Sequence, residues 1–240
     1  MKRSMAPSFL PISRKRFKWA LKPRPGPHPG DRAVPLGTLL REVLGLAKNM
    51  REARYILRQG HVKIDGKPVK DHRFPVGLMD VVELVPLKKF YRMLPTKKRA
   101  VQPLEIEEAE KGLKLCMVMK KTVVKAGALQ ISLHDGRTTL IKEDSPLQDI
   151  KTGGAVLYNL EDKALLDYIP LEPGIQALII GGKRRGLMGE VQGVRHPKKM
   201  GPKLVSIKLP SGEVTETTKD YVFPVGKEKP LIKLPTEAVE

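Results

Sequence analysis

Three arginines at helical spacing in the segment 49–59 carry the clearest chemical signal in this sequence. Arg51, Arg54 and Arg58 fall within an arc of about 60° when residues are placed 100° apart around a helix. Guanidinium groups bind phosphate oxygens in a fork, and a helical row holds several at the spacing of a folded nucleic-acid backbone. The alternative is an ordinary solvated helix face. Because few acidic residues lie nearby, we interpret the row as an RNA-contacting surface.

Two helices and a small sheet are expected to position this row. Apolar residues at helical spacing predict a first helix over 36–44, and Asn49 and Gly60 are suitable as the N-cap and the stop of a second helix over 49–59. The segment 61–70 alternates apolar and polar residues around Asp65-Gly66, which predicts a tight β-hairpin. A third strand over 80–85 is placed to pack beside the hairpin.

A second basic cluster lies in a glycine-rich loop, Gly-Gly-Lys-Arg-Arg-Gly, at 181–186. Glycines let the backbone turn sharply and approach a ligand closely, while Lys183, Arg184 and Arg185 supply positive charge. A further basic loop follows at 195–203. Short strands without helices surround both loops and predict a small β-barrel over 173–226. A phosphate-binding loop would need Lys and then Ser or Thr where Leu187 and Met188 stand, which argues against nucleotide hydrolysis.

The charge balance of the chain points to a polyanionic partner. The 240 residues contain 45 Lys and Arg against 26 Asp and Glu, a formal net charge of +19. Residues 1–35 form a basic, proline-rich segment, and the alternating prolines of 23–29 exclude a helix. We expect an arm that becomes ordered only against RNA, with Phe17 and Trp19 available for stacking. A position for Trp19 in a core is an equal alternative.

The middle of the chain is expected to be a mostly-β domain. Strands are predicted over 113–125, 128–133, 138–141, 155–160 and 165–169, with a short helix over 105–111. The predicted fold class is α+β with several domains. Its segments are an arm at 1–35, a helix-helix-hairpin RNA-binding module at 36–88, a central domain at 89–172, a small β-barrel at 173–226 and a tail at 227–240.

Catalytic, metal and cofactor chemistry have no supporting pattern. The five histidines are scattered without ligand spacing and are expected at the surface or facing RNA. The single cysteine, Cys116, lies among apolar residues, so we expect a buried, inert thiol. The acidic residues of 105–110 are expected on a solvated helix. No apolar run has the length of a membrane span, so a soluble protein that stays inside the cell, with no membrane partner, is expected.

The stretch LLREVLGLAKNMREARYILRQGHVKIDGKPVKDHRFPVGLMDVVEL, residues 39–84, resembles the RNA-binding module of the e-type family of small-subunit ribosomal protein four, which occurs in archaea and eukaryotes. KWALKPRPGPH at 18–28 and YVFPVGKEKPLIKLP at 221–235 also resemble that family, and the loop at 181–186 resembles a KOW motif. The chain departs from the family at its first dozen residues and in the basic loop 195–203. Its compact length favours the archaeal form.

The resemblance implies a structural constituent of the small ribosomal subunit in the cytoplasm, a monomer within the particle. Its partners would be small-subunit ribosomal RNA and neighbouring ribosomal proteins. The alternatives are an RNA-modifying enzyme, which would need a catalytic or cofactor motif that 90–170 lacks, and a KOW-type transcription factor. The residues expected to contact RNA are Arg14, Lys15, Arg16, Lys18, Arg24, Lys48, Arg51, Arg54, Arg58, Lys63, Lys67, Arg73, Lys183, Arg184 and Arg185.

Overall fold

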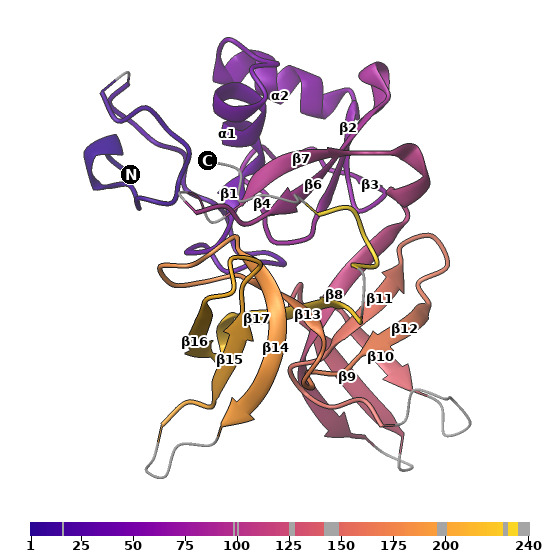
Figure 1. The fold of residues 1–240 in the computed structure, drawn as a ribbon. Coiled ribbons are helices and arrows are strands. Elements are labelled where there is room, and N and C mark those ends of the chain that lie inside the picture. Colours follow the sequence, from indigo (N-terminus) through magenta and orange to yellow (C-terminus); the bar gives the residue numbers. More distant parts are fainter. Residues whose placement is uncertain are drawn as a thin grey trace. The chain divides into compact units, whose positions relative to one another are not determined.

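The computed structural model describes residues 1–15, 17–97, 99, 101–124, 128–141, 149–195, 201–227 and 230–234. The chain divides into two compact units, Met1–Gly112 and Leu113–Glu240. Short helices and many strands make up the described chain (Figure 1), which confirms the predicted mixed α+β class. No helix in these ranges is long and apolar enough to cross a membrane.

The first unit contains short helical segments and strands of two to six residues. Its elements in chain order are η1 (Arg3–Met5), β1 (Val34–Pro35), α1 (Leu36–Thr38), η2 (Leu39–Val43), α2 (Met50–Arg58), β2 (Val62–Ile64), β3 (Lys67–Pro68), β4 (Pro75–Val76), β5 (Val81–Leu84), η3 (Val85–Leu87), β6 (Lys89–Leu94), β7 (Gln102–Ile106) and η4 (Glu108–Glu110).

The predicted first helix is present in an altered form. A single turn of α-helix, α1, continues into a π-helical turn, η2, and the turn ends before Gly45, whose φ is +66°. Leu36, Leu39 and Leu40 are buried, as their helical spacing predicts. They form part of the core under α2, which lies beside α1 in Figure 1.

The predicted hairpin and its neighbouring strand are confirmed. β2 pairs with β3 through Ile64 and Lys67, and with β5 through Ile64 and Val82, in a sheet of order β3-β2-β5-β6-β7. Asp65 and Gly66 both have positive φ, +49° and +76°, as a type I′ hairpin turn requires at its two central positions. β1 and β4 form a separate antiparallel pair.

The sheet continues past residue 88, where the predicted module ends. β6 pairs with β5, and β7 pairs with β6 through Phe90 and Ile106. The helix predicted over 105–111 is therefore wrong: Glu105 belongs to a strand, and only the turn η4 follows. Burial of Ile106 and pairing across the sheet outweigh a weak helical periodicity.

The acidic stretch after β7 is also not a solvated helix. Glu110 pairs with Arg92, whose side chain is fully buried, with 2.7 Å between Oε2 and Nη1. Burial lowers the pKa of Arg92, and the charge and hydrogen bond of Glu110 act in the opposite direction. An unpaired arginine at this position would carry a large desolvation cost, so Glu110 has a structural role.

The N-terminal arm contributes to the core of the first unit. Ala6, Leu10 and Ala20 are buried in the same apolar cluster as Leu36. Arg3 is fully buried; its Nε donates to the Trp19 carbonyl at 3.2 Å, and its guanidinium pairs with Glu42. The arm thus has partners inside the chain, which differs from the expectation of an arm ordered only by RNA.

His28 is a second buried polar group of the arm. Its Nε2 lies 2.8 Å from Oδ1 of Asp80, and the other oxygen of Asp80 accepts from the Gly77 N–H at 2.8 Å. The expectation of a surface histidine was wrong here, because its partner lies 52 residues away along the chain. A sequence pattern does not reveal a pair so far apart.

The second unit consists of strands and short turns in the described residues. Its elements are β8 (Leu113–Val123), β9 (Leu129–Leu133), β10 (Thr138–Ile141), β11 (Ala155–Asn159), β12 (Leu165–Ile169), β13 (Gln176–Ile179), β14 (Met188–Arg195), β15 (Leu204–Lys208), β16 (Val214–Thr218), η6 (Lys219–Tyr221) and β17 (Val222–Gly226).

Two antiparallel sheets of five strands, in the orders β10-β9-β8-β11-β12 and β16-β15-β14-β13-β17, make up this unit. The strands agree closely with the predicted ones because alternation of apolar residues is a local signal. Each sheet has a core of its own, around Ile131 and Val156 in the first and around Val191 and Ile207 in the second. Residues 125, 196–200 and 235–240, on which parts of the predicted strand, basic loop and tail fall, lie outside the described residues.

Cys116 is buried, as predicted, and lies beside an unexpected ion pair. Lys114, with no exposed side-chain surface, has its Nζ 3.1 Å from Oδ2 of Asp135, and Cys116 Sγ lies 3.8 Å from the same oxygen. Burial alone would raise the pKa of Asp135, but Lys114, His134 and Arg137 together hold it below its usual value. The carboxylate therefore stays charged inside the unit.

Candidate nucleic-acid interface

Helix α2 begins at a capping box. The Asn49 side chain accepts from the Glu52 N–H at 2.9 Å, and the Glu52 carboxylate accepts from Asn49 Nδ2 at 2.8 Å and from the Lys48 N–H at 2.7 Å. The inner face of the helix buries Ala53 and Leu57 completely. Side chains on the opposite face consequently point outward from a helix that is fixed at its start and along its inner side.

The three arginines of α2 lie on that outward face. Arg51, Arg54 and Arg58 are exposed, and together with Glu52 and Tyr55 they line a shallow groove of about 480 Å³. The carboxylate of Glu52 is engaged in the cap. In the ranges that the structure covers, neither Arg51 nor Arg58 forms an ion pair, so their charges face outward unneutralised.

Arg54 is held by a histidine. Its Nη2 lies 3.3 Å from Nε2 of His72. Burial, followed by the positive charge of Arg54, lowers the pKa of His72 from its ordinary value of 6.5. At neutral pH the ring is thus uncharged, and its Nε2 accepts a hydrogen bond from the Arg54 guanidinium, which keeps its charge.

Arg24 and Arg73 meet at one carboxylate. Nη1 of Arg24 lies 3.0 Å from Oδ2 of Asp71, and the Arg73 N–H donates to Oδ1 at 2.9 Å. The Arg24 N–H also donates to the Arg73 carbonyl at 2.9 Å. Burial would raise the pKa of Asp71, but these contacts and His72 lower it overall. The arm and the module thus present two exposed arginines side by side, one of them paired with an acid.

The predicted lysines of the module have different environments. Lys48 and Lys67 are exposed, the first just before α2 and the second on the hairpin. Lys63 is half-buried, and its Nζ lies 3.5 Å from Oε1 of Glu83 on β5. Lys63 is therefore partly neutralised, whereas the other two are available to a ligand.

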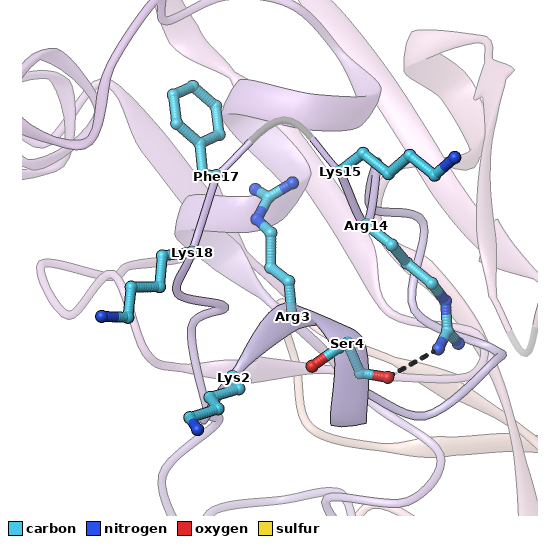
Figure 2. Close-up of a pocket in the computed structure, with 7 residues that line it drawn as sticks. All are labelled: Lys2, Arg3, Ser4, Arg14, Lys15, Phe17 and Lys18. Atoms are coloured by element: carbon cyan, nitrogen blue, oxygen red, sulfur yellow. Dashed lines mark hydrogen bonds between the residues drawn. The ribbon is translucent and has the colours of Figure 1, made fainter.

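The arm forms a second basic site (Figure 2). A pocket of about 290 Å³ is lined by Ser4, Phe17 and five cations: the predicted Arg14, Lys15 and Lys18 and the unpredicted Lys2 and Arg3. Arg14 is turned back along the arm, where its Nη1 donates to the Ser4 carbonyl at 3.2 Å. Arg16 lies outside the described residues.

Phe17 and Trp19, the two aromatic residues of the arm that were predicted to stack on RNA, are accessible. Phe17 is 46% exposed, with the guanidinium carbons of Arg3 and Arg41 at 5.0 and 5.3 Å from its ring centre. Trp19 is 60% exposed, and Nζ of Lys18 lies 5.5 Å from its ring. Trp19 is consequently not a core residue, which removes one of the two alternatives considered for it.

The glycine-rich loop of the second unit separates its three cations. Gly182 and Gly186 have φ of +79° and +86°, which only glycine adopts readily. Lys183 is exposed, whereas Arg184 forms an ion pair with Glu213 and Arg185 is half-buried, which lowers the pKa of its guanidinium. The hydrogen bond and charge of Arg184 lower the pKa of Glu213, so this pair remains ionised at neutral pH.

The structure brings most of the candidate residues together in three places, apart from the Arg24–Arg73 pair at Asp71 and the hairpin lysines Lys63 and Lys67. The α2 face holds Arg51, Arg54 and Arg58, with Lys48 just before it; the arm pocket holds Arg14, Lys15 and Lys18; and the loop of the second unit carries Lys183. The sequence reasoning missed Tyr55, which follows Arg51 by four residues and shares its face. That spacing was the signal that could have found it. Within the described ranges no group of three or more His, Cys, Asp or Glu side chains could hold a metal ion.

A capped basic helix followed by a tight hairpin and a small antiparallel sheet defines the class: an RNA-binding module of the S4 type. The S4 domain matches residues 35–82, the RS4NT (NUC023) domain matches 1–31, and the Ribosomal family S4e matches 87–165. The chain belongs to the S4e family of ribosomal proteins.

Relatives match this chain over nearly its whole length. Small ribosomal subunit protein eS4 from Ignicoccus hospitalis is 43% identical over 99% of this chain and 95% of its own length. The protein of that name from Staphylothermus marinus is also 43% identical, over 99% and 96%. The crystal structure of the 30S ribosomal protein S4e from Thermoplasma acidophilum, 28% identical, superposes with a TM-score of 0.69 over 82% of this chain and 96% of that one. These archaeal relatives confirm the family predicted from the sequence.

Proposed function

We propose that this chain is a structural constituent of the small ribosomal subunit and binds small-subunit ribosomal RNA. Its full-length relatives carry the name of a small-subunit protein, which supports this role in the cytoplasmic ribosome over an RNA-modifying enzyme or a transcription factor. The chain catalyses no reaction. It acts as a monomer within the particle and touches neighbouring ribosomal proteins.

The outward face of α2 is the observation that carries the proposal. Arg51 and Arg58 are exposed cations with no acid to neutralise them in the described chain, on a helix fixed by its cap and its buried side. Exposed like charges repel one another, and this repulsion is relieved when a polyanion binds and neutralises them. RNA phosphates supply that charge, and their neutralisation lets RNA helices approach each other.

Further contacts come from the arm and from both units. Each site binds weakly alone, and linkage on one chain makes the combined attachment strong. The proposed contacts are Arg14, Lys15, Arg16, Lys18, Arg24, Lys48, Arg51, Arg54, Arg58, Lys63, Lys67, Arg73, Lys183, Arg184 and Arg185.

The second unit is proposed to contain a central β domain up to residue 172 and a KOW-type domain over 173–226. The two separate five-stranded sheets support this division. The glycine loop between β13 and β14, with its exposed Lys183, supports the KOW assignment.

Sedimentation of reconstituted small subunits in sucrose gradients tests the proposal. The protein should migrate with small subunits at moderate salt and be released progressively as salt is raised, because an affinity built on many phosphate contacts falls steeply with salt concentration. A protein that stays at the top of the gradient at every salt concentration contradicts the proposed function. Reconstitution without this chain provides the matched control for particle integrity.

A further inference from the structure

We infer that Tyr55 is a nucleobase-stacking residue, which holds one unpaired base of the RNA over the groove of α2. The inference rests on the proposed function and deepens it, because it names the element of RNA that this face recognises. Phosphate contacts carry no direct sequence information, whereas an aromatic ring selects a base that has left the helical stack.

The exposure of Tyr55 is the first observation. Its side chain is 65% exposed, although its neighbours on the inner side of the same helix are fully buried. It therefore adds little to the packing of the unit. Tyrosine is also a weaker helix former than the arginines around it, so local helix preference does not explain its place.

The surroundings of the ring are the second observation. Arg51 precedes Tyr55 by four residues and Arg58 follows it by three, so both lie next to it on the helix surface. These side chains, with Arg54 and Glu52, line the groove of about 480 Å³. Clefts that hold small ligands have volumes of about 300–1,000 Å³, a range that admits one nucleotide.

The charges in the groove are arranged for a phosphate-linked base. Glu52 is the acid of this group, and both of its carboxylate oxygens accept hydrogen bonds from the cap residues Lys48 and Asn49. Arg54 is engaged by His72, with 3.3 Å between Arg54 Nη2 and His72 Nε2. Arg51 and Arg58 remain to bind the phosphates on either side of the base that stacks on Tyr55.

A double-mutant cycle between protein and RNA tests the inference. The RNA is the fragment of small-subunit ribosomal RNA that the wild-type protein protects from ribonuclease, and each unpaired nucleotide is replaced in turn by an abasic residue. We expect one abasic position to lower the affinity about tenfold for the wild type, because base-aromatic stacking is worth about 1–3 kcal/mol per base. With Tyr55→Leu the same abasic residue should have no effect.

Tyr55→Phe is the matched control, because it keeps the ring and should keep the full tenfold effect. Circular dichroism checks that each variant is folded. The inference is overturned if no abasic position has a cost that depends on residue 55, or if Tyr55→Phe behaves like Tyr55→Leu, which would assign the effect to the hydroxyl. Absence of any protected RNA fragment would overturn the proposed function itself, together with this inference.

Discussion

The arginine row of α2 and the glycine-rich loop at 181–186 each carry three cations, yet the fold treats them differently. On α2 the only acid lining the groove is bound in the helix cap, and two of the three arginines stay unneutralised within the described chain. In the loop Arg184 is paired with Glu213 and Arg185 is half-buried. Equal local charge therefore does not mean equal capacity to bind a polyanion: the nearest acids decide it.

Charge reversal should separate the two regions most strongly. We expect Arg51→Glu, Arg54→Glu and Arg58→Glu together to lower the affinity for small-subunit ribosomal RNA about 100-fold. The slope of log K against log salt should also fall by about two to three, at roughly 0.7–0.9 per lost phosphate contact. Filter binding across a salt series measures both quantities.

Reversal of Lys183, Arg184 and Arg185 is the matched comparison, with the same change in net charge. A loss of tenfold or less is expected, because one of these cations is already neutralised and another is half-buried. Equal losses for the two triple variants would contradict the difference between the regions.

Removal of the helix cap should weaken the α2 face through its scaffold. We expect Asn49→Ala to lower the free energy of unfolding by about 1 kcal/mol, because the Glu52 N–H loses its acceptor. Urea titration followed by the fluorescence of Trp19, the single tryptophan and a residue of the first unit, measures this. Asn49→Asp keeps an acceptor and should stay near wild type; an equal loss in both variants would exclude the cap as the cause.

Breaking the ion pair between Arg184 and Glu213 should make the loop at 181–186 bind RNA more strongly. Glu213→Gln removes the paired charge, so we expect RNA affinity to rise about threefold and the salt slope to steepen by about 0.7–0.9, one phosphate contact. Glu216→Gln makes the same charge change beside Arg195, where the ion pair is longer at 3.5 Å, and should have the smaller effect. An affinity that is unchanged by Glu213→Gln would show that the pair does not restrain the loop.

The smallest effect concerns the histidine beside Arg54. Because the pKa of His72 is lowered from 6.5 in the folded chain, the unfolded chain takes up a proton at higher pH than the folded one. Above about pH 6.5, His72 therefore does not lower the free energy of unfolding. That free energy declines as the pH falls below this value towards the pKa of His72 in the folded chain. Urea titrations at pH 7.5 and 5.5 should show a smaller decline for His72→Gln than for the wild type. His61→Gln serves as the control, and a decline that is the same in all three proteins would contradict the assignment.

Much of the local structure could be predicted from the sequence. The cap at Asn49, the Asp65-Gly66 turn and the alternating strands of the second unit depend on residues close together in the chain, and the structure has them all. The strands β6 and β7 were not predicted, because their stability comes from pairing of β6 with β5 and of β7 with β6 and not from a pattern of their own.

The sequence by itself determined the excess of positive charge, the arginine row and the glycine loop, because composition and spacing follow directly from the order of residues. Only the tertiary structure decided which charges are free. Arg3, His28 and Lys114 are buried beside Glu42, Asp80 and Asp135, and Arg184 meets Glu213, each pair joining residues that are 21 to 52 positions apart. Electrostatic energy depends on distance in space, and folding sets that distance.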